Sequence, residues 1–90
     1  MGEQKIKTID LSKVTAVLVD GTAQEFNVHK SLATTLYATP NPGQGKFAME
    51  LYANPIVELT EENKEYIRTG LEQGGFFFNI KEAILELLNN

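Results

Sequence analysis

The 90-residue chain contains no cysteine, and it has a single histidine. The lack of cysteine excludes a disulfide framework, a thiolate nucleophile and any metal site built on sulfur. The one histidine, His29, has no further ligand-type residues around it at a metal-binding spacing, so we expect it to be exposed or to begin a helix. We therefore predict no catalytic residue, no metal site and no cofactor.

The sequence also lacks a long apolar run. The longest runs, residues 76–78 and 16–19, are far shorter than the roughly 18 residues that would cross a bilayer. The first residues carry no apolar segment of the kind that marks a secretory signal. We therefore expect a cytoplasmic protein that does not associate with membranes.

Excess positive charge is absent as well, and the net charge is −4. Residues 1–57 balance their basic and acidic side chains, so the whole excess of negative charge lies in residues 58–90. An acidic surface repels phosphate backbones, which argues against nucleic acid as a partner. Solvated helix faces account for this charge most simply, and an acidic docking surface is the alternative.

Length and composition indicate one α+β domain that spans residues 1–90, with residues 1–4 disordered and residues 89–90 frayed. The chain is 42% hydrophobic and 22% charged, which is typical of a globular domain. A chain of this size has room for one modest core. We expect an N-terminal β-hairpin, extended at most to a three-stranded antiparallel sheet, to pack against three to four amphipathic helices.

The hairpin is predicted by Asp20-Gly21 between two strand-like runs, residues 14–19 and 23–28. A two-residue loop and a three-residue loop with Gly21 in the left-handed conformation give different registers. The second loop pairs Leu18 with Thr22 and puts more of the apolar side chains on one face. The hydrophobic pattern favours it. Its inner face is predicted to contain Val14, Ala16, Leu18, Gln24, Phe26 and Val28.

Two further short strands are expected, in residues 5–11 and 56–59, and the sequence leaves open whether the second extends the hairpin. Residues 29–38 show helical spacing after Asn27, a suitable N-cap. Prolines and glycines in residues 39–45 predict a loop, followed by a helix over residues 46–53. The apolar faces predicted for these two helices include Leu36, Tyr37, Phe47, Leu51 and Tyr52.

Thr60 caps a third predicted helix that runs to about residue 73 and ends at Gly74-Gly75. The last helix, over residues 76–88, has the clearest apolar period in the chain. Its predicted buried side chains are Phe76, Phe77, Ile80, Ala83, Ile84, Leu87 and Leu88.

The segment Pro42-Gly43-Gln44-Gly45-Lys46 resembles a phosphate-binding loop at first sight. That loop requires a glycine where this chain has Pro40 and a serine or threonine where it has Phe47. We therefore interpret the segment as a connector between helices. A small ligand site formed by residues 40–45 with His29 and Tyr37 or Tyr52 is the least favoured functional hypothesis.

Phe78 points away from the face that Phe76, Phe77 and Ile80 share. One interpretation is a helix start that is buried on nearly all sides. The other is an exposed apolar patch that meets a partner or a second copy. The candidate interaction surface comprises Val17, Val19, Phe78 and Leu85.

Five short features follow one another across residues 14–88: Val19-Asp20-Gly21 with Phe26, Lys30-Ser31-Leu32 through Leu36-Tyr37, Phe47-Ala48 with Leu51-Tyr52, Val57-Glu58-Leu59-Thr60-Glu61-Glu62, and Lys81-Glu82-Ala83-Ile84. This order resembles small uncharacterised proteins of bacteriophages, prophages and other bacterial mobile elements. The resemblance implies no known activity and carries over no functional residues.

The sequence thus favours a non-catalytic protein-interaction or assembly module, with a protein or a second copy as its partner. The alternative is a regulator that acts on nucleic acid or on a nucleic-acid-binding partner.

Overall fold

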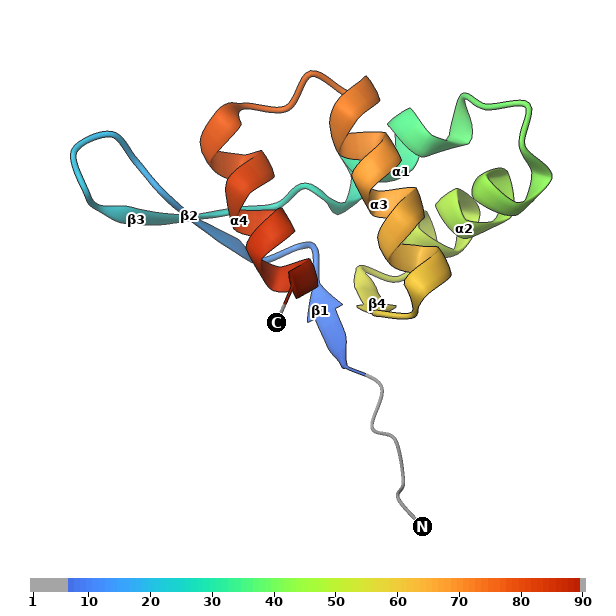
Figure 1. The fold of residues 1–90 in the computed structure, drawn as a ribbon, viewed down its shortest axis with the longest axis horizontal. Helices are drawn as coiled ribbons and strands as arrows, with labels where there is room; N and C mark the ends of the chain where they lie inside the picture. Colours follow the sequence, from blue (N-terminus) through green and yellow to red (C-terminus); the bar gives the residue numbers. More distant parts are fainter. Residues whose placement is uncertain (1–6, 90) are drawn as a thin grey trace, which may run out of the picture.

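The computed structural model describes residues 7–89, and these form an α+β domain (Figure 1). The expected disorder at residues 1–4, the start of the expected strand 5–11 and residue 90 lie outside the described residues. The elements, in chain order, are β1 (Thr8–Asp10), β2 (Val14–Val17), β3 (Ala23–Phe26), α1 (His29–Tyr37), α2 (Pro42–Ala53), β4 (Ile56–Glu58), α3 (Glu61–Gln73) and α4 (Phe78–Asn89).

Strands β2 and β3 form the predicted hairpin, in the register that the hydrophobic pattern favours. Ala16 lies opposite Gln24, and the Leu18 N–H donates to the Thr22 carbonyl at 2.7 Å. Gly21 has φ +91°, the left-handed conformation that a three-residue loop needs at this position. Val14 and Ala16 are buried, whereas Thr15 and Val17 on the other face are exposed. The hairpin prediction is therefore confirmed, including its odd-length loop.

Asp20 stiffens the same loop. Its Oδ1 accepts hydrogen bonds from the Thr22 backbone N–H at 3.0 Å and from the Thr22 hydroxyl at 2.7 Å. Both bonds favour the ionised carboxylate, so they lower the pKa of Asp20 below its usual value. Asp20 and Gly21 thus act together: one closes the turn by its side chain, and the other takes the positive φ.

Replacing Gly21 with alanine is expected to lower the free energy of unfolding by about 1–2 kcal/mol, because a side chain disfavours the left-handed conformation. Gly45→Ala is a matched control, since a Cβ at either glycine meets no atom within 4 Å. Gly45 lies inside α2 with ordinary helical geometry, so alanine there should raise stability by up to about 1 kcal/mol. Urea unfolding measures both changes. Equal effects of the two substitutions would contradict the loop geometry.

Strand β4 forms where residues 56–59 were expected to be extended, but it does not join the hairpin. It pairs with β1 in a second two-stranded antiparallel sheet, with Ile9 opposite Val57. The alternative in which residues 56–59 extend the hairpin to three strands is therefore wrong. Leu11 connects the two sheets: its N–H donates to the Pro55 carbonyl at 2.9 Å, and its carbonyl accepts from the Val28 N–H at 3.0 Å. A fully buried residue thus sits where the chain passes from one sheet to the other.

Helix α2 begins at Pro42, four residues before its predicted start. Asn41 caps it, because the Asn41 Oδ1 accepts from the N–H groups of Gly43 (2.9 Å) and Gln44 (3.2 Å). Proline suits the first position of a helix, where its missing N–H costs no hydrogen bond. The expected loop at residues 39–45 is therefore mostly the first turn of a helix. Gln44 is buried and donates from its side-chain Nε2 to the Leu36 carbonyl at 3.2 Å, which attaches α2 to the end of α1.

Helix α3 has the predicted cap and end. The Thr60 hydroxyl accepts from the Asn63 N–H at 3.1 Å, and the Gly74 N–H closes the last turn on the Gly70 carbonyl at 2.9 Å. Gly70 lies at the crossing of α3 and α1. A Cβ there would come within 2.6 Å of Leu32 Cδ1 and 2.9 Å of Leu36 Cγ, so the missing side chain permits the close approach.

Helix α4 begins at Phe78 rather than at residue 76. Gly75, with φ +64°, turns the chain, and the Phe77 carbonyl accepts the first helical hydrogen bond, from the Lys81 N–H at 3.0 Å. Phe76 and Phe77 therefore belong to the connection from α3. Phe76 is half-buried, but Phe77 is 74% exposed, so its predicted burial is wrong. Ile80, Ile84 and Leu88 are buried as the periodicity predicts.

Candidate functional site

Three of the four residues of the predicted interaction surface lie together. Val17, Phe78 and Leu85 line one shallow hollow of about 580 Å³ between β2 and α4, together with Glu82 and Glu86. Phe78 is 77% exposed and Val17 is 60% exposed, whereas Leu85 is half-buried. We call these five residues the α4–β2 surface. Val19 is fully exposed but does not line the hollow, because it lies in the loop beyond β2.

Local geometry holds the two elements of this surface in place. Val17 is exposed because alternate residues of a strand point to opposite faces and Ala16 is buried. The Asn79 side-chain amide donates to the Val17 carbonyl at 3.3 Å, which attaches the start of α4 to the edge of β2. Ile80 and Ile84 are buried on the opposite side of the helix, and so Phe78 and Glu82 are directed outwards.

The α4–β2 surface is apolar and acidic at once. Glu82 and Glu86 lie one turn apart and are both exposed. Within residues 7–89, the ion pairs are Lys64–Glu61 and Arg68–Glu65, both within α3, so neither carboxylate of α4 has a cationic partner there. The surface thus presents one aromatic ring beside two unbalanced negative charges.

A second apolar concavity lies between α1 and α2. It measures about 380 Å³ and is lined by Ala33, Thr34, Tyr37, Ala48, Met49 and Tyr52, which we call the α1/α2 groove. The prediction had placed Tyr37 and Tyr52 on core-facing sides of their helices, but both are more than half exposed. Each lies next to a fully buried leucine, Leu36 or Leu51, and the leucine takes the inward position.

The α1/α2 groove carries positive charge at its rim. Lys30 Nζ lies 5.5 Å from the centre of the Tyr52 ring, a cation–π distance. Lys46 precedes Met49 by three residues, so both lie on one side of α2. The two lysines are exposed, and neither pairs with a carboxylate among the described residues.

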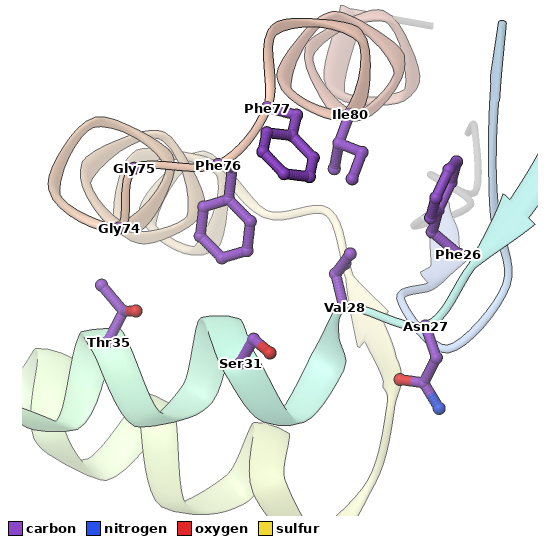
Figure 2. Close-up of a pocket in the computed structure, with 10 residues that line it drawn as sticks. All are labelled: Phe26, Asn27, Val28, Ser31, Thr35, Gly74, Gly75, Phe76, Phe77 and Ile80. Atoms are coloured by element: carbon purple, nitrogen blue, oxygen red, sulfur yellow. The ribbon is translucent and has the colours of Figure 1, made fainter. Parts of the chain in front are cut away.

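A third hollow, of about 340 Å³, separates the start of α4 from α1 (Figure 2). The rings of Phe76 and Phe77 lie on one side of it, with Ser31 and Thr35 of α1 on the other (Figure 2). Phe26 of β3 borders the same space. Sequence reasoning missed this aromatic hollow because it assigned Phe76 and Phe77 to the core. The Gly74-Gly75 pair just before them was the signal that the helix begins later.

The residues of the least favoured ligand site are not brought together. His29 begins α1, as one of the two expected placements had it, but it is buried. Its Nδ1 lies 3.3 Å from the Asn27 Oδ1, which also accepts from the His29 backbone N–H. Tyr37 and Tyr52 line the α1/α2 groove without His29 or residues 40–45. In the described part of the chain, His, Asp and Glu side chains form no group of three that could hold a metal ion.

Comparisons with protein-family models, with curated proteins and with solved structures found no match to this chain. The resemblance to bacteriophage and mobile-element proteins therefore stays a prediction. Of residues 7–89, no helix has the length and apolar character needed to cross a membrane.

Proposed function

We propose that this protein is a non-catalytic assembly module that associates with further copies of itself through the α4–β2 surface. One observation carries the proposal: Phe78 and Leu85 of α4 meet Val17, from the distant strand β2, in one outward-facing hollow. An exposed aromatic ring beside aliphatic side chains is typical of the centre of a protein interface.

The chemistry of the surface supports a protein as the partner. Aromatic and aliphatic groups gain free energy when they leave water, and this gain needs an apolar counterpart. Glu82 and Glu86 beside Phe78 would repel a phosphate backbone, which disfavours the alternative of a nucleic-acid regulator. Two carboxylates at the border of an apolar patch instead select a partner that offers positive charge.

The test is Phe78→Asp, with the mass of the particle measured by light scattering and sedimentation over a dilution series. We expect the wild-type protein to associate as concentration rises, and the variant to associate about 30-fold more weakly or not at all. The variant should stay folded, because the side chain is exposed and Phe78 is the first residue of α4. A carboxylate at a helix N-terminus stabilises the helix.

Phe77→Asp is the matched control. Phe77 is the neighbouring residue and is almost equally exposed, but it lines the aromatic hollow rather than the α4–β2 surface. We expect this variant to associate like the wild type. A wild-type protein that stays monomeric at millimolar concentration would refute the proposal. Loss of association in Phe77→Asp alone would move the interface to the aromatic hollow.

A further inference from the structure

The α4–β2 surface is one half of a contact, and the structure offers a candidate for the other half. We infer that the α4–β2 surface of one copy binds the α1/α2 groove of the next copy, in a head-to-tail arrangement. This inference rests on the proposed function, and it names the surface of the partner copy that Phe78 meets.

Charge complementarity is the first argument. The α4–β2 surface carries Glu82 and Glu86. Near the α1/α2 groove, Lys30 lies over the Tyr52 ring, and Lys46 is exposed on α2 one turn before Met49. All four side chains lack an ion-pair partner within the described residues. Two copies of the α4–β2 surface placed against each other would instead bring four carboxylates together, which is unfavourable. The pattern of charge therefore favours two different surfaces over a self-paired one.

The lengths of the two surfaces also agree. Phe78 and Leu85 are seven residues apart on α4, which is about 10 Å along a helix axis. Ala33 and Tyr37 line the α1 side of the groove, and Lys30, one turn before Ala33, extends that side to seven residues as well. Lys30, at the start of α1, lies by Tyr52, near the end of α2. The two helices therefore run antiparallel, and Lys46 lies towards the other end of the groove.

The interior of the α1/α2 groove suits an aromatic ring. Its lining is almost entirely apolar, with Ala33 and Ala48 buried at its base. Tyr37, Met49 and Tyr52 line it as well, and each is more than half exposed. Methionine adapts its shape and makes favourable contacts with aromatic rings. Phe78 can therefore enter between Met49 and the two tyrosines, while Glu82 and Glu86 approach the lysines.

A contact between two different surfaces has a consequence that a self-paired contact lacks. Each copy keeps one free half after binding, so the protein assembles into closed rings or into open chains. A variant in which only one of the two surfaces is disrupted can still bind at one end of such an assembly. Two variants, one disrupted in the α4–β2 surface and the other in the α1/α2 groove, can form a complex of two chains but nothing larger.

Complementation tests the inference with the whole 90-residue chain. Met49→Asp places a carboxylate in the α1/α2 groove at an exposed position, and Phe78→Asp places one in the α4–β2 surface. Each variant alone is expected to associate at least about tenfold more weakly than the wild type. An equimolar mixture is expected to form a complex of two chains, one of each variant, as measured by light scattering with one variant labelled. Samples of labelled and unlabelled Phe78→Asp alone are the control and should stay monomeric.

The outcomes separate the inference from the proposed function. If Met49→Asp associates like the wild type while Phe78→Asp does not, the groove is not the counterpart: the inference fails and the proposed function stands. If neither single variant associates and their equimolar mixture forms no complex either, the head-to-tail contact is refuted. If the wild type itself is monomeric, both ideas fall.

Charge exchange provides a second readout. Lys30→Glu with Lys46→Glu is expected to weaken association at least about tenfold, and adding Glu82→Lys with Glu86→Lys to the same chain is expected to restore it. No restoration would contradict the pairing of these charges.

Discussion

Leu11→Ala is expected to lower the free energy of unfolding by about 2–5 kcal/mol. Leu11 has no exposed surface, and it lies where the β1–β4 sheet meets the end of the hairpin. Its two backbone hydrogen bonds, to Pro55 and from Val28, survive the substitution, so the loss comes from packing and from the cavity left behind. A domain of this size has a free energy of unfolding near the low end of about 5–15 kcal/mol, so the variant should lose a large part of its stability.

Urea unfolding followed by circular dichroism measures this loss, at a concentration low enough to keep the protein monomeric. Ile56→Ala is the control. It removes an aliphatic side chain of similar size from β4, in the sheet that ends just before Leu11, but from a position that is 54% exposed. We expect a cost of about 1 kcal/mol or less, as is usual for surface positions. Similar costs at both positions would show that Leu11 does not join the two sheets in a common core.

Gly70→Val is expected to destabilise the protein by about 2–3 kcal/mol, through overpacking rather than through a cavity. The Cβ of any side chain at residue 70 would come too close to Leu32 Cδ1 and to Leu36 Cγ. Both leucines are fully buried, so they have little room to move away. The helices α1 and α3 would have to separate, although valine itself forms helix slightly better than glycine does.

Gly45→Val is the matched control for this substitution. Gly45 also lies in a helix, but a Cβ there meets no atom within 4 Å. We expect its unfolding midpoint in urea to change by no more than the helix propensities imply, a few tenths of a kcal/mol. If both valine variants unfold at the same midpoint, the close approach of α3 to α1 is not a constraint on the fold.

Local chemistry allowed the best of the predictions. The hairpin register follows from Asp20-Gly21 and from the alternation of Val14 and Ala16, because a shift of one residue would expose the apolar side chains. The start of α3 follows from Thr60, whose hydroxyl accepts a hydrogen bond from an unpaired N–H of the first turn. In both places the deciding interaction joins residues only a few positions apart.

Other local signals were present and were misread. The prolines and glycines of residues 39–45 predict a loop, yet Asn41 is a strong N-cap and Pro42 suits the first helical position. The period that ran through residues 76–88 also included Phe76 and Phe77, although Gly75 takes a positive φ just before them. A run of apolar residues shows that a helix is near, but only the turn before it determines where the helix begins.

The candidate surfaces show a different limit. Tyr37 and Tyr52 fit the apolar stripe of their helices, but Leu36 and Leu51 beside them occupy the core. The apolar face of a helix is several residues wide, and the residues at its edges are buried or exposed depending on which neighbouring elements pack against them. For that reason the sequence grouped Val17, Val19, Phe78 and Leu85 as apolar residues outside the core, but it did not show that Val17 lies beside Phe78 while Val19 does not.

By itself, the sequence determined the α+β class, the loop of the hairpin and the existence of each helix, since these depend on turn chemistry and on periodicity over short distances. Only the tertiary structure decided that β4 pairs with β1, that Leu11 joins the two sheets, and that Val17 rather than Val19 lines a hollow with Phe78. Those contacts join residues about 17 to 61 positions apart along the chain. They depend on how whole elements fit around one small core, which no short stretch of sequence specifies.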